Sequence, residues 1–202
     1  MGRRVYFSFH YQDVIDFRAN VVRNSGIFRA GGGNFRDASI WEEAEEKNVR
    51  AIKELIESEL VGSSVTCVLI GSETYNRRWV RYEIVKSFEM QKGLLGTHIN
   101  WIKGKDKQTK FWPGENPFEY LRLKVSSDGK YVSIFEKKDQ GLFSNWVPYR
   151  DMPEIRNKHL KEKHYGKEYT FTDFYDTYSY SWDDGKNSFS KWVEKAAVKA
   201  KK

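Results

Sequence analysis

The sequence contains a continuous apolar run, SVTCVLIG, at residues 64–71. A strand with one face in water alternates apolar and polar residues, and this run does not alternate. Strands without alternation are typical of parallel sheets, in which helices cover both faces. The run therefore favours an α/β architecture built on a central parallel sheet.

Further segments of the first hundred residues fit this architecture. Residues 3–9, 34–40 and 93–101 read as strands. The segments between the strands carry apolar residues at helical spacing: Val14, Phe17 and Val21 within 13–24, Ile52, Leu55, Ile56 and Leu60 within 41–60, and Val80, Ile84 and Phe88 within 77–89. Thr74 or Asn76 is expected to cap the last of these helices. This alternation of strand and helix predicts a doubly wound parallel sheet.

The second half of the chain has a different pattern. Strands dominate residues 101–150, and Asp128-Gly129 is expected to form a hairpin turn. A closing amphipathic helix is predicted with Phe189, Trp192, Val193 and Ala196 on its buried face. We expect a single domain (1–202), in which residues 1–100 form the core βα repeats and 101–202 a β-rich and helical elaboration packed on them.

Composition excludes several classes of protein. The net charge is +7, but the last seven residues hold three lysines and no acid, which leaves 7 − 3 = +4 for the rest. The remaining charges are mixed in sign and no nucleic-acid-binding motif is present, which argues against DNA or RNA as a partner. No apolar run is long enough to span a membrane, and no secretory signal is present.

The cysteine and histidine content bears on the cellular compartment that we expect for the protein and on whether it binds a metal. Cys67, the single cysteine, excludes an intramolecular disulfide and is expected to be a buried thiol, so a cytoplasmic location is predicted. His98, His159 and His164 show no spacing typical of metal ligands, so no metal site is expected.

Candidate site residues follow the predicted strands. In an open parallel sheet, ligands bind at the carboxyl edge, where the strands end. Ser8, Phe9 and His10 end the first strand and Asp37 lies at the second; the helix after the third carries Trp79 and Glu83, four residues apart. Together they predict a small-molecule site. The simpler interpretations are a solvated charge for Glu83, core packing for Trp79 and a neutral, hydrogen-bonded His10.

Several motifs resemble those of a known family. VYFSFHYQD, DASIWEE and SVTCVLIGSETYNRRWVRYEI are similar to the box motifs of Toll/interleukin-1 receptor (TIR) domains, and more narrowly to the TIR-like proteins of the Thoeris anti-phage defence system. NPFEYL, SSDGK and DDGKNSFSKWV resemble the C-terminal elaboration of the same proteins. The resemblance covers nearly the whole chain and implies a flavodoxin-like TIR fold.

The resemblance also implies an activity. Enzymatic TIR domains cut NAD between nicotinamide and ribose, and some cyclise the ADP-ribose; NAD is then the substrate and no cofactor is needed. Glu83 matches the catalytic glutamate, Phe9 and His10 the residues that line the nucleotide pocket, Trp79 the aromatic one turn before the glutamate, and Asp37 an acidic residue of less defined role. Ser8 is a further candidate substrate contact.

Partners are implied by the same resemblance. A phage-derived trigger would switch on synthesis of a cyclic ADP-ribose isomer, and this diffusible nucleotide would activate a separate effector that destroys NAD. Homo-oligomers formed through TIR–TIR contacts are also implied, and the glycine loop at 31–33 occupies the position of the loop that TIR domains use for assembly.

One carboxylate is sufficient for this chemistry. Nicotinamide leaves NAD from a cationic state, so no general acid is required, and the transition state resembles an oxocarbenium ion that a carboxylate stabilises. An aromatic face can hold the pyridinium by a cation–π contact, worth ~0.5–2 kcal/mol. Cyclisation also requires that water be kept out.

Two other classes of function remain open at this stage. The chain could be a TIR module that only assembles with other TIR domains, although such adaptors do not need the Trp79–Glu83 pair. It could also be another glutamate-dependent enzyme on a flavodoxin-like sheet, such as an N-deoxyribosyl transferase.

Overall fold

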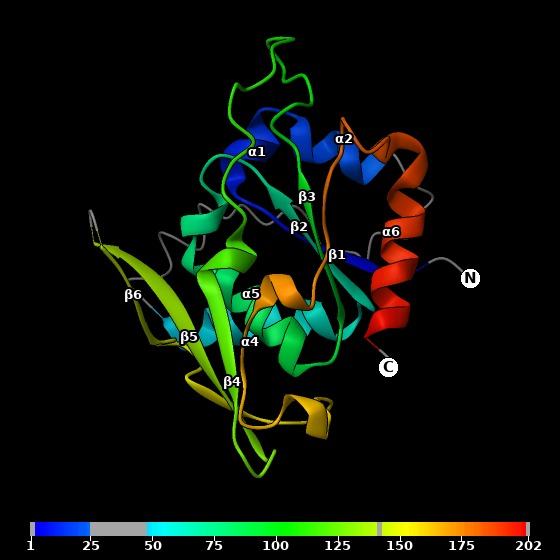
Figure 1. The fold of residues 1–202 in the computed structure, drawn as a ribbon. Coiled ribbons are helices and arrows are strands. Elements are labelled where there is room, and N and C mark those ends of the chain that lie inside the picture. Colours follow the sequence, from blue (N-terminus) through cyan, green and yellow to red (C-terminus); the bar gives the residue numbers. More distant parts are fainter. Residues whose placement is uncertain (1–2, 25–47, 141–142, 201–202) are drawn as a thin grey trace.

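The core of the protein is a four-stranded parallel sheet (Figure 1). The structure is a computed structural model that describes residues 3–24, 48–140 and 143–200. The strands are β1 (Val5–Ser8), β2 (Val65–Ile70), β3 (Gly93–His98) and β9 (Thr177–Ser179), in the order β1-β2-β3-β9, and every pair is parallel. The parallel α/β architecture is therefore confirmed. The edge strand β9 comes from the C-terminal half, so that half contributes to the core sheet itself.

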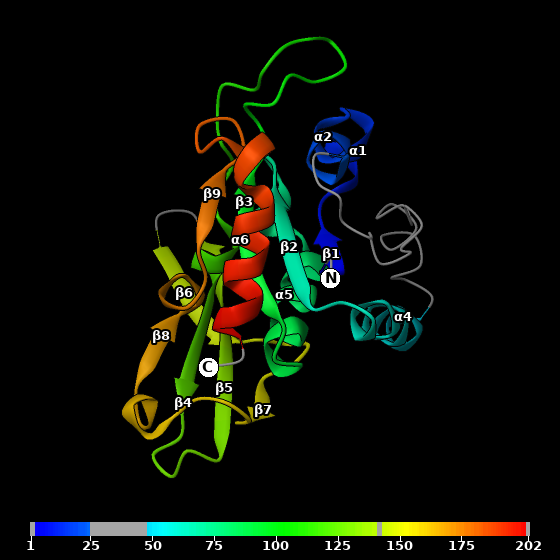
Figure 2. The ribbon, with the colours of Figure 1, turned by 90° about the vertical axis from the view of Figure 1, so that its right-hand side faces the viewer.

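The apolar run at 64–71 forms the central strand β2, and every residue of that strand is buried. Cys67 and Leu69 pack in a cluster with α6 (Gly185–Lys199), whereas Val68 and Ile70 pack in a cluster with α5 (Arg78–Glu89). Because alternate residues of a strand point to opposite faces, α5 and α6 cover opposite faces of the sheet. Figure 2 shows α6 running along its face. The predicted inward rows of both helices are buried: Val80, Ile84 and Phe88 in α5, and Phe189, Trp192, Val193 and Ala196 in α6.

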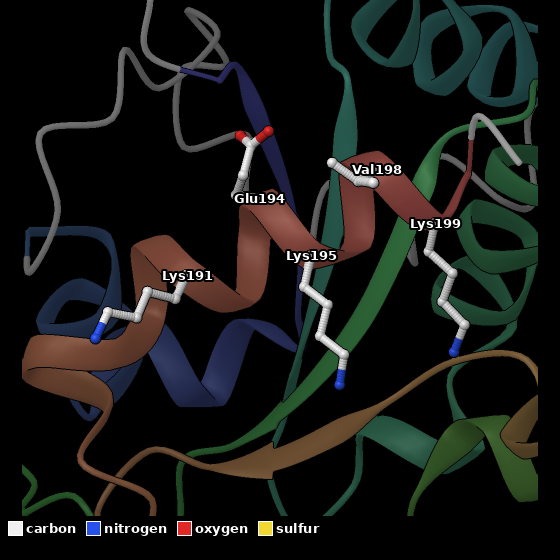
Figure 3. Close-up of a pocket in the computed structure, with 5 residues that line it drawn as sticks. All are labelled: Lys191, Glu194, Lys195, Val198 and Lys199. Carbon is white, nitrogen blue, oxygen red and sulfur yellow. The ribbon is translucent and has the colours of Figure 1, made fainter.

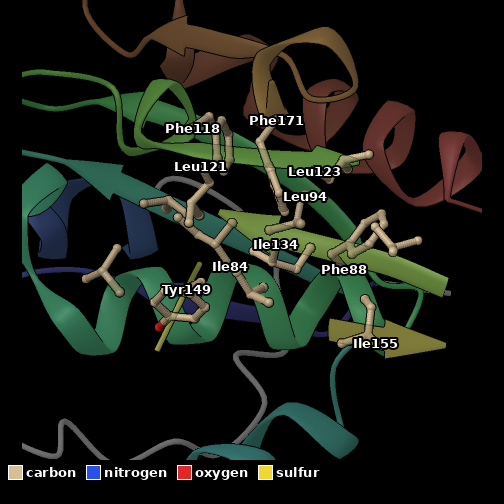
Figure 4. Close-up of a cluster of buried hydrophobic side chains, with 14 of the residues drawn as sticks. Ile84, Phe88, Leu94, Phe118, Leu121, Leu123, Ile134, Tyr149, Ile155 and Phe171 are labelled. Carbon is tan, nitrogen blue, oxygen red and sulfur yellow. The ribbon is translucent and has the colours of Figure 1, made fainter. Parts of the chain in front are cut away.

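A second, antiparallel sheet packs on the outer side of α5. Its strands run in the order β6-β5-β4-β8, with β7 also paired to β5. The predicted Asp128-Gly129 turn joins β4 to β5, and Gly129 has a φ of +70°, which suits glycine. Ile84 and Phe88 of α5 meet side chains of this sheet in one apolar cluster (Figure 4). The bounds are β4 (Leu121–Val125), β5 (Tyr131–Gln140), β6 (Phe143–Pro148), β7 (Glu154–Arg156) and β8 (Glu168–Thr170), with 3₁₀ turns at η2 (Pro117–Tyr120), η3 (Glu162–His164) and η4 (Phe171–Asp173).

Helix α4 (Val49–Val61) covers a third side of α5. Its buried residues Ile52, Ile56 and Leu60 form a cluster with Trp79 and Tyr82 of α5, as the helical spacing predicted for α4; Leu55 is only partly buried. Polar groups reinforce this contact.

A buried carboxylate ties α4, α5 and the antiparallel sheet together. Arg78 of α5 donates two hydrogen bonds to Asp151, at 2.7 and 2.9 Å, and Lys53 of α4 lies 3.0 Å from the same carboxylate. Burial alone would raise the pKa of Asp151, but Arg78 and Lys53 outweigh burial and lower it. The carboxylate therefore stays ionised at neutral pH.

The helix predicted at 13–24 is wrong in register. The chain forms two short helices, α1 (Tyr11–Ile15) and α2 (Arg18–Asn24), separated by Phe17 with a left-handed φ of 64°. This break changes the phase of the helix, so Phe17 and Val21 are exposed, and Ala19 and Val22 are buried instead. The Val14 side chain lies outside the described part.

The expected cap of α5 is also wrong. Thr74 and Asn76 lie in a preceding 3₁₀ turn, η1 (Thr74–Asn76), and Arg77 is the N-cap residue, without a side-chain cap. The Thr74 hydroxyl instead accepts a hydrogen bond from the Gly71 N–H at 2.9 Å and so closes the turn that follows β2.

Some predicted elements lie outside the described residues. They are the glycine loop at 31–33, the strand at 34–40 with Asp37, and the first turns of the helix predicted from 41. Within the described ranges, none of the helices has the length and apolar character needed to cross a bilayer.

Close packing of β3 on α6 predicts a sensitive glycine. A Cβ added at Gly93 would lie 2.8 Å from the backbone carbonyl of Ala196, so Gly93→Ala must push the helix off the sheet. We expect a loss of about 1–3 kcal/mol in the free energy of unfolding, measured by urea denaturation. Gly62→Ala is the control, because the atoms nearest to its Cβ belong to the flexible Arg4 side chain, and it should change stability by less than about 0.5 kcal/mol. Equal stability of the two variants would contradict this packing argument.

Candidate functional site

Glu83 lies in the second turn of α5 with its carboxylate directed at β1. The Tyr6 hydroxyl donates to Oε1 and the Ser8 hydroxyl to Oε2, each at 2.5 Å. Tyr6 and Ser8 are two residues apart in the same strand, so both point to the face of the sheet that α5 covers. Glu83 is 7% exposed. It is therefore a buried and doubly hydrogen-bonded carboxyl group, and the solvated-charge interpretation is wrong.

Burial raises the pKa of Glu83 to about 7. The hydrogen bonds from Ser8 and Tyr6 favour the ionised form and partly oppose this rise, while the nearby charge of Glu59 adds to it. Among the described residues, no lysine or arginine forms an ion pair with Glu83. Near neutral pH the group therefore exists in both protonation states and can accept or stabilise a positive charge.

Trp79 has a different environment from Glu83, although both belong to one stripe of α5. Its ring packs in the α4 cluster, edge-to-face with Tyr82 at 6.0 Å between centroids, and the Arg78 guanidinium lies 4.7 Å from the ring. Trp79 is 7% exposed, and its Nε1 has no hydrogen-bond partner in the described part of the chain. The ring therefore serves the core, and its N–H is the atom left for another group.

The other predicted residues divide between two faces. Phe9 packs against the cluster beneath α6, with Phe7, and so lies on the face opposite Glu83. His10 is buried just after β1, and its carbonyl accepts the Asp13 N–H at 2.9 Å. Asp37 lies outside the described residues. The structure thus brings Ser8 to Glu83 and separates Phe9 from it.

Two polar residues near this edge were not identified from the sequence. Tyr6 contacts Glu83 directly, and the two-residue period of β1 would have placed it beside Ser8. Asp13 is a second buried carboxylate, packed on Gly71 so closely that a Cβ there would lie 2.2 Å from its oxygens. Burial raises the pKa of Asp13 to about 6, against the opposing charge of Lys110 at 3.6 Å.

A hollow on the outer side of α6 is not part of this site. It is lined by Lys191, Glu194, Lys195, Val198 and Lys199 (Figure 3). Lys195 and Lys199 already pair with Asp176, at 3.1 and 3.6 Å. Because α6 and α5 cover opposite faces of the sheet, this hollow is separated from Glu83 by the sheet itself.

Comparison with known proteins points to one family. The model described as "Thoeris protein ThsB, TIR-like domain" matches residues 6–103, which include most of β1 and all of β2, β3 and α5. A protein of Bacillus cereus (strain MSX-D12), named "Putative cyclic ADP-D-ribose synthase ThsB1", is 47% identical over 197 residues. That similarity spans 96% of this chain and the whole of the relative, so it includes the antiparallel sheet and α6.

The buried carboxyl group predicts an unusual effect of pH on stability. Because the pKa of Glu83 is raised on folding, its contribution to stability is fully present below the unfolded value of about 4.5 and is lost as the pH rises through about 7. The uncharged isostere Glu83→Gln should therefore stabilise the fold by about 2–3 kcal/mol at pH 8 and by little at pH 5. Thermal unfolding at the two pH values measures this.

The matched control is Glu57→Gln. Glu57 also accepts a tyrosine hydrogen bond at 2.5 Å, from Tyr82, but it is half-exposed and lies 3.3 Å from Lys86. Removing its charge should give no stabilisation at pH 8. A Glu83→Gln variant that is no more stable than the wild type at pH 8 would mean that Glu83 is ionised without cost in the fold.

Proposed function

This chain belongs to the Thoeris ThsB family of TIR-like proteins, and on that basis we propose that it cleaves NAD between nicotinamide and ribose and cyclises the ADP-ribose. The observation that carries the proposal is the Glu83 carboxyl, buried in α5 and oriented by β1. The activity in the name of the B. cereus relative supports the same reaction. An adaptor that only assembles would gain nothing from a buried carboxyl group that destabilises its fold.

Glu83 acts on the ribose side of the bond that breaks. As nicotinamide leaves with the bonding electrons and becomes neutral, positive charge develops on the ribose ring. An ionised carboxylate in a water-poor site stabilises this charge far better than one in bulk water. The bound cation also lowers the pKa of Glu83, so substrate binding favours the ionised form that the reaction requires.

Burial also suits the second half of the reaction. For a cyclic product, a nucleophile of the same ADP-ribose must reach the reactive carbon before water does. The Glu83 carboxyl contacts the hydroxyls of Tyr6 and Ser8, and its surroundings include the apolar cluster between α4 and α5 and the nearby charge of Glu59. The buried N–H of Trp79, which has no hydrogen-bond partner among the described residues, is the donor that we propose for the substrate at the same end of α5.

The wider pathway follows from the family. A phage-derived trigger activates the enzyme, and the cyclic ADP-ribose isomer diffuses to a separate effector that depletes NAD. The protein works in the cytoplasm, and TIR–TIR contacts between copies accompany activation. His10 and Asp37 stay in the proposal as contacts to the nucleotide, whereas Phe9, which packs on the face opposite Glu83, does not.

The reaction predicts that Glu83→Gln abolishes nicotinamide release. The wild type, incubated with NAD and a lysate of phage-infected cells, should release nicotinamide and form a cyclic ADP-ribose isomer, measured by chromatography and mass spectrometry. Glu83→Gln should lower the rate by about 10³-fold or more, because it removes the charge that stabilises the transition state. For the wild type, kcat/KM should rise with pH to a plateau, with half the maximum near pH 7, because the free enzyme must ionise Glu83.

Glu57→Gln is again the control and should keep the wild-type rate, since Glu57 lies on α4 and its polar partners within the described ranges are Tyr82 and Lys86. If neither the wild type nor the control releases nicotinamide in infected lysate, the chain is not an NAD-cleaving enzyme. Full activity of Glu83→Gln would mean that the chain is an NAD-cleaving enzyme but that Glu83 takes no part in its mechanism.

A further inference from the structure

We propose that Tyr6 is a positioning residue of this enzyme, which holds the Glu83 carboxylate toward the substrate and favours its ionised form. The inference rests on the proposed function and concerns a residue of β1 that contacts Glu83 and no other carboxyl group among the hydrogen bonds of the described residues. Its hydroxyl lies 2.5 Å from Oε1, and Ser8 holds Oε2 at the same distance.

Two donors from one strand fix the carboxyl group in both position and rotation. A single hydrogen bond would allow the carboxyl plane to turn about the bond to its Cγ, whereas one donor on each oxygen prevents this turn. The Tyr6 ring is itself held by packing against the α4 cluster, so the donor cannot move away. Holding a reacting group in a fixed orientation raises the reaction rate more than it raises the affinity for the substrate.

The tyrosine hydroxyl keeps its proton and so can donate it to the ionised Glu83 carboxylate. Burial, and then the nearby charge of Glu83, raise the pKa of Tyr6 well above its ordinary value, so the hydroxyl keeps its proton throughout the working pH range. A permanent donor stabilises the ionised carboxylate more than the neutral acid, and burial of Glu83 makes this help necessary. Without Tyr6, a smaller fraction of Glu83 would be ionised at neutral pH.

The hydroxyls of Tyr6 and Ser8 lie in different environments. Tyr6 packs against the α4 cluster, which contains Ile52, Ile56 and Trp79, and so lies in the core and away from the end of the strand. Ser8 is the last residue of β1 and reaches the carboxyl edge of the sheet. The Ser8 hydroxyl donates its hydrogen bond to Glu83, and the lone pairs of the Ser8 oxygen can accept a hydrogen bond from a ribose hydroxyl.

The test is the pH profile of Tyr6→Phe. This variant keeps the ring and removes only the hydroxyl, so the rise of kcat/KM with pH should move upward by about one unit, and the rate should return near that of the wild type at high pH. At pH 7 the expected loss is about 5- to 10-fold. Tyr82→Phe is the matched control, because it deletes a tyrosine–glutamate bond of equal length from the same cluster, but on Glu57. It should leave the pH profile unmoved.

A second readout needs no catalysis. The pH at which thermal stability falls reports the ionisation of Glu83 in the folded protein, and in Tyr6→Phe this midpoint should also move upward relative to Tyr82→Phe. If Tyr6→Phe does not unfold cooperatively, Ser8→Ala removes the other donor and should shift the same midpoint in the same direction. Unchanged midpoints, or a rate loss equal at every pH, would overturn the proposal. Absence of nicotinamide release by the wild type would refute the proposed function alone, because the stability midpoints still test the role of Tyr6.

Discussion

The architecture depends on the enclosure of helix α5. The parallel sheet, the antiparallel sheet and α4 cover it on three sides, and nine of its twelve residues are buried. A helix enclosed in this way cannot direct its charged side chains to water, so each needs a partner inside the protein. Arg81 lies 2.9 Å from Glu136 of β5 and Arg78 pairs with Asp151, whereas the partners of Glu83 in the described part of the chain are two neutral hydroxyls.

This difference sets Glu83 apart from the structural ion pairs. Arg81 and Glu136 neutralise each other, and their bridge joins α5 to the antiparallel sheet. A cationic partner would have kept the Glu83 carboxylate ionised at neutral pH. In the reaction that we propose, it would also have cancelled the negative charge that stabilises the oxocarbenium ion. Neutral donors orient the carboxylate and leave its charge available. The resulting cost in stability is the kind of strain that functional sites retain.

Much of the fold could be predicted from residue patterns within single segments of the sequence. The unbroken apolar run of β2, the inward row of α5 and the buried face of α6 each follow from residues close together in the sequence. The sequence predictions were wrong where residues far apart in the chain determine the local structure. Arg18 is buried because it donates to the Ile102 and Gln108 carbonyls, and Phe17 turns into a left-handed conformation just before it. No helical periodicity within 13–24 contains that information.

The same distinction applies to the site. The family resemblance made Glu83 a candidate, and strand order predicted that it lies near the end of β1, but which β1 side chains reach it depends on how α5 crosses the sheet. That crossing is set by Trp79 and Tyr82 against α4 and by Ile84 and Phe88 against the cluster of the second sheet. These contacts join segments as far apart in the sequence as Phe88 and Phe171. Trp79 therefore contributes to the geometry of Glu83 through packing, because it is one of the residues that fix where α5 lies against α4 and the sheet.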